Sequence, residues 1–418
     1  MCPTVLEEKT KLAIALDPVI CNILFTINLI LHLRRPSSSS PWQNPVNNMK
    51  EDELPLVSIM LPMLKERRDS IFATVNCLAD QTYPQGKMDV LFIVEPDDPT
   101  TKAYVEEAAE FLREKAIDSK ILTTDGKLRM KPHAMNRALE EAKGKILCVY
   151  DADDSFPKDQ MEKAVNLLIE NGYDCVQPKI YRKRESLSGK FLMIDTFTWN
   201  RKFLPAIYNL SGVFPLSGEG FYAKKEAIQE VGGFPEVLTE DAYLSILLAE
   251  KGKKLGLLDS ELTELAPRGW RSHFRQRLRW FRGYITCLGR VLKAKMPLKQ
   301  KLGFSIPFLA PITCAFSPFM WTFMALYWIT WAFFPTLNII APWMTHWLYS
   351  NGILYWSIIL AYIGNPIVIF SLMHSLAGTD MEKHAPTALL APLYWIFIGL
   401  AAIASFFKSP KNWAKTAR

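Results

Sequence analysis

The sequence predicts an α/β domain set between membrane-spanning segments. Strand-length apolar runs alternate with amphipathic helical stretches across residues 54–265, the pattern of a sheet covered by helices. Long apolar stretches lie on either side of this region, at 12–33 and 304–407. Hydrophobic residues make up 49% of the 418 residues and include 12 tryptophans, which is high for a soluble enzyme.

The formal net charge of +7 suits a protein that lies on an anionic membrane surface or binds polyanions. Nucleic-acid binding is not expected, because the arginines cluster beside apolar segments and no recognition module is present. The seven cysteines show neither C-x-x-C pairs nor metal-ligand spacing, so we predict free thiols in a reducing compartment.

Residues 12–33 are apolar and long enough to form an N-terminal transmembrane helix. Arg34 and Arg35 follow directly, so the positive-inside rule places the next segment in the cytoplasm. The residues before this stretch lack the basic region and cleavage site of a signal peptide. Residues 36–50, rich in serine, proline and asparagine, predict a linker.

Residues 54–265 are predicted to form one α/β domain with a parallel sheet, because strands and helices alternate with crossover spacing. The predicted strands are Leu56–Leu61, Val90–Val94, Lys120–Leu122 and Ile146–Tyr150, and the predicted helices are Asp69–Asp80, Thr100–Lys115 and Lys131–Lys143. Since the carboxyl ends of parallel strands meet at one edge, we expect the side chains that follow them to meet there.

The fourth predicted strand ends in an acidic cluster that contains Asp151, Asp153 and Asp154. If the backbone stays extended, Asp151 and Asp153 point to one side, and paired carboxylates suit Mg²⁺ or Mn²⁺. The alternative is a solvated acidic turn. Asp97 and Asp98 follow the second strand and are expected at the same edge of the sheet.

Thr239, Glu240 and Asp241 directly precede a predicted helix at Ala242–Lys251. Thr239 could cap this helix, and acids in a first turn favour the helix dipole. The functional alternative is a carboxylate at the helix start that takes a proton from an acceptor hydroxyl.

Pro267–Arg282 combines six arginines with aromatic side chains, which suits a helix at a membrane interface. Gln276, Arg279 and Trp280 share one face of this helix with Gly283. Arg279 could bind a diphosphate and Trp280 could stack on a sugar ring. Binding of lipid head groups is the alternative for these arginines.

Lys131 stands at the start of a predicted helix beneath the same edge of the sheet. Its amine could reach a phosphate or remain solvated. His133 is expected to make local hydrogen bonds, since no second histidine lies at metal-ligand spacing. Asn136 completes a Lys-x-x-x-x-Asn element.

These motifs, in this order, resemble those of the membrane-embedded family 2 glycosyltransferases, which include cellulose, hyaluronan, chitin and poly-N-acetylglucosamine synthases. The resemblance implies a cytosolic GT-A (Rossmann-like) catalytic domain at 54–265, inserted between transmembrane helices. It further implies interfacial helices at 266–300, three to four spans within 304–407 and a basic tail at 408–418. The protein would be a multi-pass protein of the plasma membrane.

The resemblance also assigns residues to a nucleotide-sugar donor and its metal. Asp97 or Asp98 would contact the uracil base, and Lys131 and Arg279 would lie beside the diphosphate. Asp151 and Asp153 match the DxD motif and would bind Mg²⁺ or Mn²⁺.

On the acceptor side, Asp241 matches the catalytic base of the TED motif. The residues implied to contact the acceptor are Gly218, Glu219 and Glu240, together with Gln276 and Trp280 of the QxxRW motif. Glu219 departs from the family pattern, because it adds a charge to a segment that is usually neutral.

The resemblance therefore implies an inverting, metal-dependent, processive enzyme. It would polymerise a sugar from UDP-glucose or UDP-N-acetylglucosamine into a β-linked polysaccharide and move the growing chain across the lipid bilayer. Two alternatives stay open: transfer of one sugar onto a lipid carrier, and a non-catalytic channel or scaffold subunit. QxxRW argues against the first alternative, and the presence of all expected acids argues against the second. Accessory or homo-oligomeric partners are not specified by the sequence.

Overall fold

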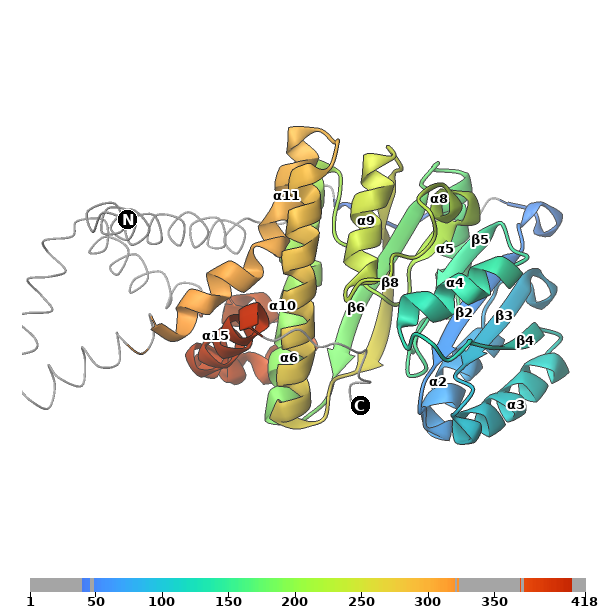
Figure 1. Ribbon diagram of the computed structural model, residues 1–418, viewed down its shortest axis with the longest axis horizontal. Coiled ribbons are helices and arrows are strands. Elements are labelled where there is room, and N and C mark those ends of the chain that lie inside the picture. The colour runs from blue at the N-terminus through green and yellow to red at the C-terminus, as the bar shows by residue number, and fades with distance from the viewer. Residues whose placement is uncertain (1–39, 46–48, 320–321, 323–368, 370–371, 408–418) are drawn as a thin grey trace, which may run out of the picture. The chain divides into compact units, whose positions relative to one another are not determined.

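The computed structural model describes residues 40–45, 49–319, 322, 369 and 372–407 (Figure 1). The chain divides into two compact units, residues 37–310 with 405–418, and residues 1–36 with 311–404. The predicted N-terminal helix and the predicted basic tail lie outside the described residues.

The first unit is built on an eight-stranded sheet with the order β1-β8-β6-β7-β5-β2-β3-β4. The strands are β1 (Trp42–Gln43), β2 (Val57–Met63), β3 (Met88–Val94), β4 (Asp118–Thr123), β5 (Ile146–Val149), β6 (Cys175–Lys183), β7 (Tyr222–Lys224) and β8 (Leu255–Leu265). The neighbouring strands are parallel, except that β7 is antiparallel to both β5 and β6. The α/β class is therefore confirmed, whereas the wholly parallel sheet is wrong.

The reversal of β7 follows from the edge at which the chain enters it. Tyr222 lies opposite Cys148 and Lys224 opposite Ile146, so β7 runs from the carboxyl end of β5 toward its amino end. The preceding loop, residues 217–220, is consequently held at the carboxyl edge of the sheet. This loop therefore lies beside the acidic residues that follow β5.

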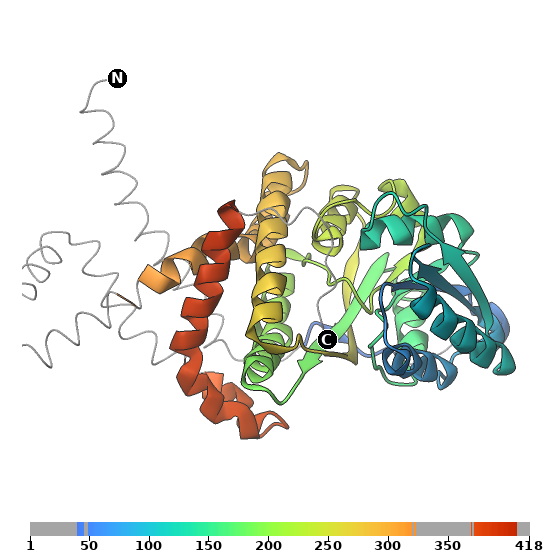
Figure 2. The same ribbon diagram turned by 60° about the horizontal axis from the view of Figure 1, so that its bottom comes forward.

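Helices cover both faces of the sheet (Figure 1 and Figure 2). One face packs against α2 (Arg68–Ala79), α3 (Pro99–Glu114) and α5 (Gln160–Ile169). The other packs against α4 (Lys131–Glu141), α7 (Leu204–Ser211), α8 (Lys225–Glu230), α9 (Glu240–Glu250), α10 (Gly269–Lys293) and α11 (Leu298–Phe308). Every residue of β2 and β3 is buried, as expected of strands covered on both sides.

One segment differs from the sequence-based expectations. Trp42 and Gln43, within the predicted linker, pair with Leu257 and Leu258 and form an edge strand. α10 (Gly269–Lys293) lies within the region 266–300 that was predicted to be helical. In addition, α6 (Leu187–Thr198) packs against β6 and leads through a π-helical turn into α7.

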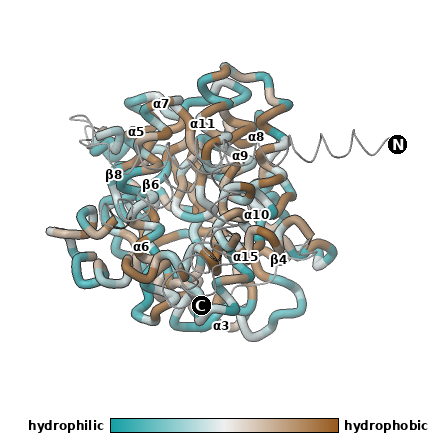
Figure 3. The backbone as a smooth tube through the Cα atoms, turned by 90° about the vertical axis from the view of Figure 1, so that its left-hand side faces the viewer, coloured by the Kyte–Doolittle hydropathy of each residue, from teal (hydrophilic) through white to brown (hydrophobic). Residues whose placement is uncertain are grey.

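Apolar helices mark the C-terminal part of the chain. α15 (Ala391–Phe407) is strongly hydrophobic (Figure 3). Among the described residues, Leu298–Phe319 and Glu382–Phe407 are long and apolar enough to cross a membrane. They overlap the two ends of the predicted membrane region 304–407, within which residues 320–321, 323–368 and 370–371 lie outside the described residues. Only the length and composition of these two helices support membrane crossing, so insertion in a membrane stays a prediction.

Candidate active site

Lys131 lies at the centre of a cluster of acids at the carboxyl edge of the sheet. Its Nζ donates hydrogen bonds to Asp151 Oδ1 at 2.5 Å and to the Gly218 carbonyl oxygen at 2.7 Å. Burial by itself would lower the pKa of Lys131, but Asp151, Glu240 and Glu219 outweigh burial and raise this pKa above its ordinary value. The surrounding acids therefore stabilise the charged form of the buried Lys131, and the position predicted for it at the start of a helix is confirmed.

Glu240 and Asp241 form the first turn of α9 and supply a pair of acids beside this cation. Burial, reinforced by Asp241, raises the pKa of Glu240 to about 7, while Lys131 and Arg279 act in the opposite direction. Burial also raises the pKa of Asp241, against the hydrogen bond that its Oδ1 accepts from the Ala242 N–H at 2.8 Å. A carboxylate pair that titrates above the usual carboxyl range is suited to proton transfer near neutral pH.

Gly218 brings the loop before β7 into contact with these groups. A Cβ atom at this position would lie 3.3 Å from Asp241 Oδ2, 3.5 Å from Lys131 Nζ and 3.7 Å from Glu240 Oε1. A side chain at position 218 would therefore occupy the space between both acids and the cation. Glycine leaves this space free of a side chain.

The TED segment, Thr239 to Asp241, is seated against α10. A Cβ atom on Gly283 would collide with the Thr239 side chain, so the two backbones approach closely. The Thr239 hydroxyl lies 3.4 Å from Cys287 Sγ on the same helix. Thr239 is the N-cap residue of α9, but its side chain makes no capping hydrogen bond. The predicted cap is wrong because the hydroxyl faces α10 instead.

The acidic segment after β5 is a turn, so the extended backbone that would point Asp151 and Asp153 to one side is not formed. The Asp154 N–H approaches the Asp151 carbonyl oxygen at 3.4 Å, which closes the turn. The Asp151 carboxylate therefore reaches Lys131, whereas Asp153 Oδ2 accepts from the Leu265 N–H at 3.2 Å. Asp154 stabilises the turn by accepting from the Asp151 N–H at 2.7 Å.

These carboxylates suit a divalent cation. Asp151 and Asp153 offer hard oxygen ligands, and the buried Asp154 Oδ1 has no hydrogen-bond partner within the described part of the chain. Burial, with Asp151 and Glu219, raises the pKa of Asp154 well above its ordinary value, which indicates crowded negative charge. Three or more metal-ligating side chains do not converge anywhere in the described residues. The set fits an ion that takes few protein oxygens and completes its shell with phosphates.

The structure separates the roles of Asp97 and Asp98. Asp98 is buried and its carboxylate holds the backbone, accepting from the Thr101 N–H at 3.2 Å and the Lys65 N–H at 2.6 Å. The Asp97 side chain is 55% exposed and pairs with Arg129 at 2.5 Å. Of the two predicted donor contacts, Asp97 is the accessible one.

Asn136 and His133 have local structural roles on α4. The Asn136 amide donates to the Phe234 carbonyl oxygen and accepts from the Phe234 N–H, both at 2.8 Å, which ties α4 to the loop before the TED segment. The His133 ring lies 3.1 Å from Glu236 Oε1 and 3.0 Å from Asp125 Oδ1, in agreement with the predicted local hydrogen bonding.

On α10, Trp280 does not present a free ring. The guanidinium carbons of Arg182 and Arg277 each lie 4.9 Å from its ring centroid. Gln276 is buried, and Glu219 pairs with Arg182 at 2.7 Å.

Arg182 and Glu264 of this region were missed because no strand was assigned to 175–183 or 255–265 from the sequence. The buried positions at the end of β8 are Ser260, Leu262 and Glu264, so apolar residues do not alternate there and gave no signal for that strand.

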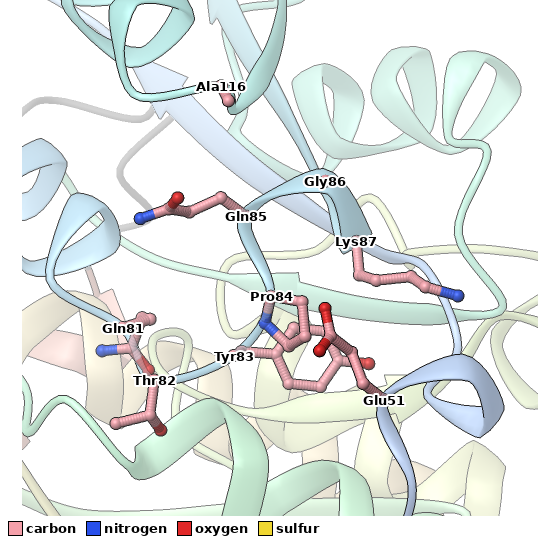
Figure 4. A pocket seen from close by; sticks show the side chains of 9 residues that line it. All are labelled: Glu51, Gln81, Thr82, Tyr83, Pro84, Gln85, Gly86, Lys87 and Ala116. Carbon is pink, nitrogen blue, oxygen red and sulfur yellow. The ribbon is translucent and has the colours of Figure 1, made fainter.

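A hollow of about 600 Å³ lies away from these acids, around the turn between α2 and the amino end of β3 (Figure 4). It is lined by Glu51, Gln81, Thr82, Tyr83, Pro84, Gln85, Gly86, Lys87 and Ala116. None of the charged side chains gathered around Lys131 reaches it, so this hollow is not the site described above.

The sequence profile described as Glycosyl transferase family group 2 matches residues 146–406, more than half of the chain. The chain belongs to this family. The profile described as Glycosyl transferase family 2 also matches residues 58–232. The protein is therefore a glycosyltransferase, and the enzyme class implied by the motifs is confirmed.

Two curated relatives of this family 2 glycosyltransferase are bacterial. Probable glycosyltransferase YdaM of Bacillus subtilis is 25% identical over 61% of this chain and 60% of its own length. Beta-monoglucosyldiacylglycerol synthase of Trichormus variabilis is 26% identical over 56% of this chain and 50% of its own length. The chain thus spans between half and three fifths of these relatives.

Among solved structures, mannosyltransferase PcManGT from Pyrobaculum calidifontis, in complex with GDP-Man and Mn²⁺, matches with a TM-score of 0.56. The match covers 91% of this chain and 98% of that one at 18% identity. This likeness and the family profiles establish a GT-A-like α/β fold with a mixed sheet for the transferase.

Proposed function

We propose that this glycosyltransferase moves a sugar, with inversion, from a nucleoside diphosphate sugar onto an uncharged hydroxyl group. The observation that carries the proposal is the acid pair Glu240 and Asp241, held beside Lys131 and facing the open position at Gly218.

Asp241 is the proposed catalytic base. Its carboxylate takes the proton of the acceptor hydroxyl while that oxygen bonds to the anomeric carbon and the bond from this carbon to the diphosphate breaks. The electron pair of the broken bond leaves on the diphosphate, whose charge Lys131 and Arg279 offset. A divalent ion held by Asp151 and Asp153 would supply further Lewis-acid stabilisation of the leaving diphosphate. On the donor side, Asp97 is the proposed contact to the base of the nucleotide.

The acid pair also favours an uncharged alcohol over a phosphate as the acceptor. An acceptor phosphate is already ionised at neutral pH and needs no base, and its charge would be repelled by Glu219, Glu240 and Asp241. An alcohol needs a base and brings no charge. The site therefore favours an alcohol over a lipid phosphate.

For the acceptor itself, we propose a lipid hydroxyl that receives one sugar. Two guanidinium groups contact Trp280, so a sugar of a growing polymer would have to share the indole with them. A relative that bears the name beta-monoglucosyldiacylglycerol synthase supports a lipid acceptor. Processive polymerisation with export is the second candidate, favoured by the QxxRW helix that packs on the TED segment through Gly283.

We also propose that the enzyme acts at a membrane, with its catalytic domain on the cytoplasmic side and several spans in the plasma membrane. The two apolar helices Leu298–Phe319 and Glu382–Phe407 support this location, as do the basic residues of α10.

The test uses detergent-purified full-length protein with UDP-glucose, UDP-N-acetylglucosamine or GDP-mannose, and dioleoylglycerol micelles as the acceptor. Nucleotide release and product masses are measured with Mg²⁺, with Mn²⁺ and with a chelator. We expect one donor to yield a product one sugar heavier than the lipid, and Asp241→Asn to abolish it. Asp118→Asn, an exposed carboxylate on β4, is the matched control. A ladder of polymer masses would establish the second candidate, and no release with any donor would overturn both.

A further inference from the structure

Arg182 is a buried cation that joins distant parts of the chain. It lies on β6 directly opposite Glu264 of β8, and the two side chains form an ion pair. The same guanidinium donates to Glu219 Oε1 of the loop before β7 at 2.7 Å. The three side chains are 11%, 0% and 7% exposed, so water does little to screen their charges.

The same guanidinium reaches α10, where its central carbon lies 4.9 Å from the ring centroid of Trp280. A second guanidinium, that of Arg277, lies at the same distance from the ring. Arg277 is itself fixed by Asp195 of α6 at 2.5 Å and by His273 at 3.3 Å. The indole is therefore held by charges from two different elements.

This cluster adjoins the proposed reaction centre. Glu219 directly follows Gly218, and a Cβ atom on Gly218 would lie 3.3 Å from Asp241 Oδ2. The residue that fixes Glu219 thereby also fixes the loop that borders the base. Arginine is suited to this task, because its planar fork can pair with carboxylates and stack on an aromatic ring together, whereas lysine offers a point charge.

We propose that Arg182 is the positioning residue of the acceptor site: it holds Glu219 and Trp280 in the orientation in which they meet the acceptor. The placement of the acceptor rests on the function proposed above. The orientation of Trp280 by Arg182 does not depend on that function, so the orientation and the proposed function can be tested separately.

The first test follows Trp280 by fluorine NMR of the full-length protein labelled with 5-fluorotryptophan. Trp280→Phe identifies the resonance. We expect Arg182→Lys to shift or broaden that resonance and leave the others in place. Lys179→Gln is the matched control, because Lys179 also lies on β6, pairs with Asp259 of β8 and contacts an indole, that of Trp42. An unchanged resonance in Arg182→Lys would overturn the proposal.

The second test measures steady-state kinetics with dioleoylglycerol micelles. We expect Arg182→Lys to raise the acceptor KM about thirtyfold, the fold-change equivalent to a desolvated cation–π contact, with the donor KM unchanged. The double variant with Trp280→Phe should be little worse than either single variant, since both remove one interaction. A fall in kcat with unchanged KM values, or additive effects, would overturn the positioning role. If the wild type glycosylates nothing, the proposed function fails while the fluorine experiment still decides the inference.

Discussion

Replacing Lys131 with methionine removes the buried cation from the acidic cluster and keeps most of the side-chain volume. Lys131 bonds to Asp151 at 2.5 Å and is only 7% exposed, so the variant leaves a carboxylate without its buried partner. Breaking a buried ion pair on one side typically costs about 3–5 kcal/mol. We expect Lys131→Met to lose stability of this order at pH 7.5.

The loss should shrink as the pH falls. The Lys131 charge lowers the pKa of Glu240 and of Asp241, so its removal raises both values further. A carboxyl group whose folded-state pKa is raised favours the folded state below its unfolded pKa, and this contribution is lost as the pH rises through the folded pKa. The stability deficit of Lys131→Met is therefore largest at high pH, and the acid limb of its kcat/KM profile, which the base Asp241 sets, moves to higher pH.

Urea unfolding at pH 5.5 and 7.5, together with pH–rate profiles, measures both effects. Lys143→Met is the control, because the Lys143–Asp118 pair lies at 2.8 Å with side chains 61% and 62% exposed, and such surface pairs contribute little. If Lys131→Met is as stable as Lys143→Met at both pH values and keeps the wild-type acid limb, Lys131 is not the counter-charge of this site.

Three further predictions test other parts of the site. Gly283→Ala should reduce kcat by at least about tenfold, because the new methyl group displaces the TED segment; enzyme assays check this effect. Gly289→Ala should instead stabilise α10 by about 0.5–1 kcal/mol in thermal unfolding, because a Cβ atom there meets nothing within 4 Å. Asp97→Ala should raise the donor KM without changing stability, whereas Asp98→Ala should lower the melting temperature through the loss of about 1 kcal/mol of capping; the reverse pattern would exchange their roles. The raised pKa of Glu240 predicts that the wild type gains thermal stability as the pH falls below about 7. Glu240→Gln should reduce this gain, and an unaltered pH dependence of the melting temperature would contradict the raised pKa.

Local pattern determined much of the catalytic half of the sheet. The apolar runs around β2, β3, β4 and β5 and the helices between them appear close to their predicted positions, because strand and helix periods depend on neighbouring residues. Since parallel strands end at one edge, the placement of Lys131 beside Asp151 also followed from the order of elements. The helix predicted at Ala242–Lys251 is present as α9 and begins two residues earlier, at Glu240.

Contacts between remote segments were decided only by the tertiary structure. The register of β6 against β8 sets Arg182 opposite Glu264, and the reversed β7 carries Glu219 to the same guanidinium. The turn at Asp151 to Asp154 and the structural use of Asp98 likewise depend on partners from other elements. Residue types and periodicity along the chain determine which elements form and which groups can do chemistry. Register, strand direction and burial determine which of those groups meet, because these properties arise from pairing between segments far apart in the sequence.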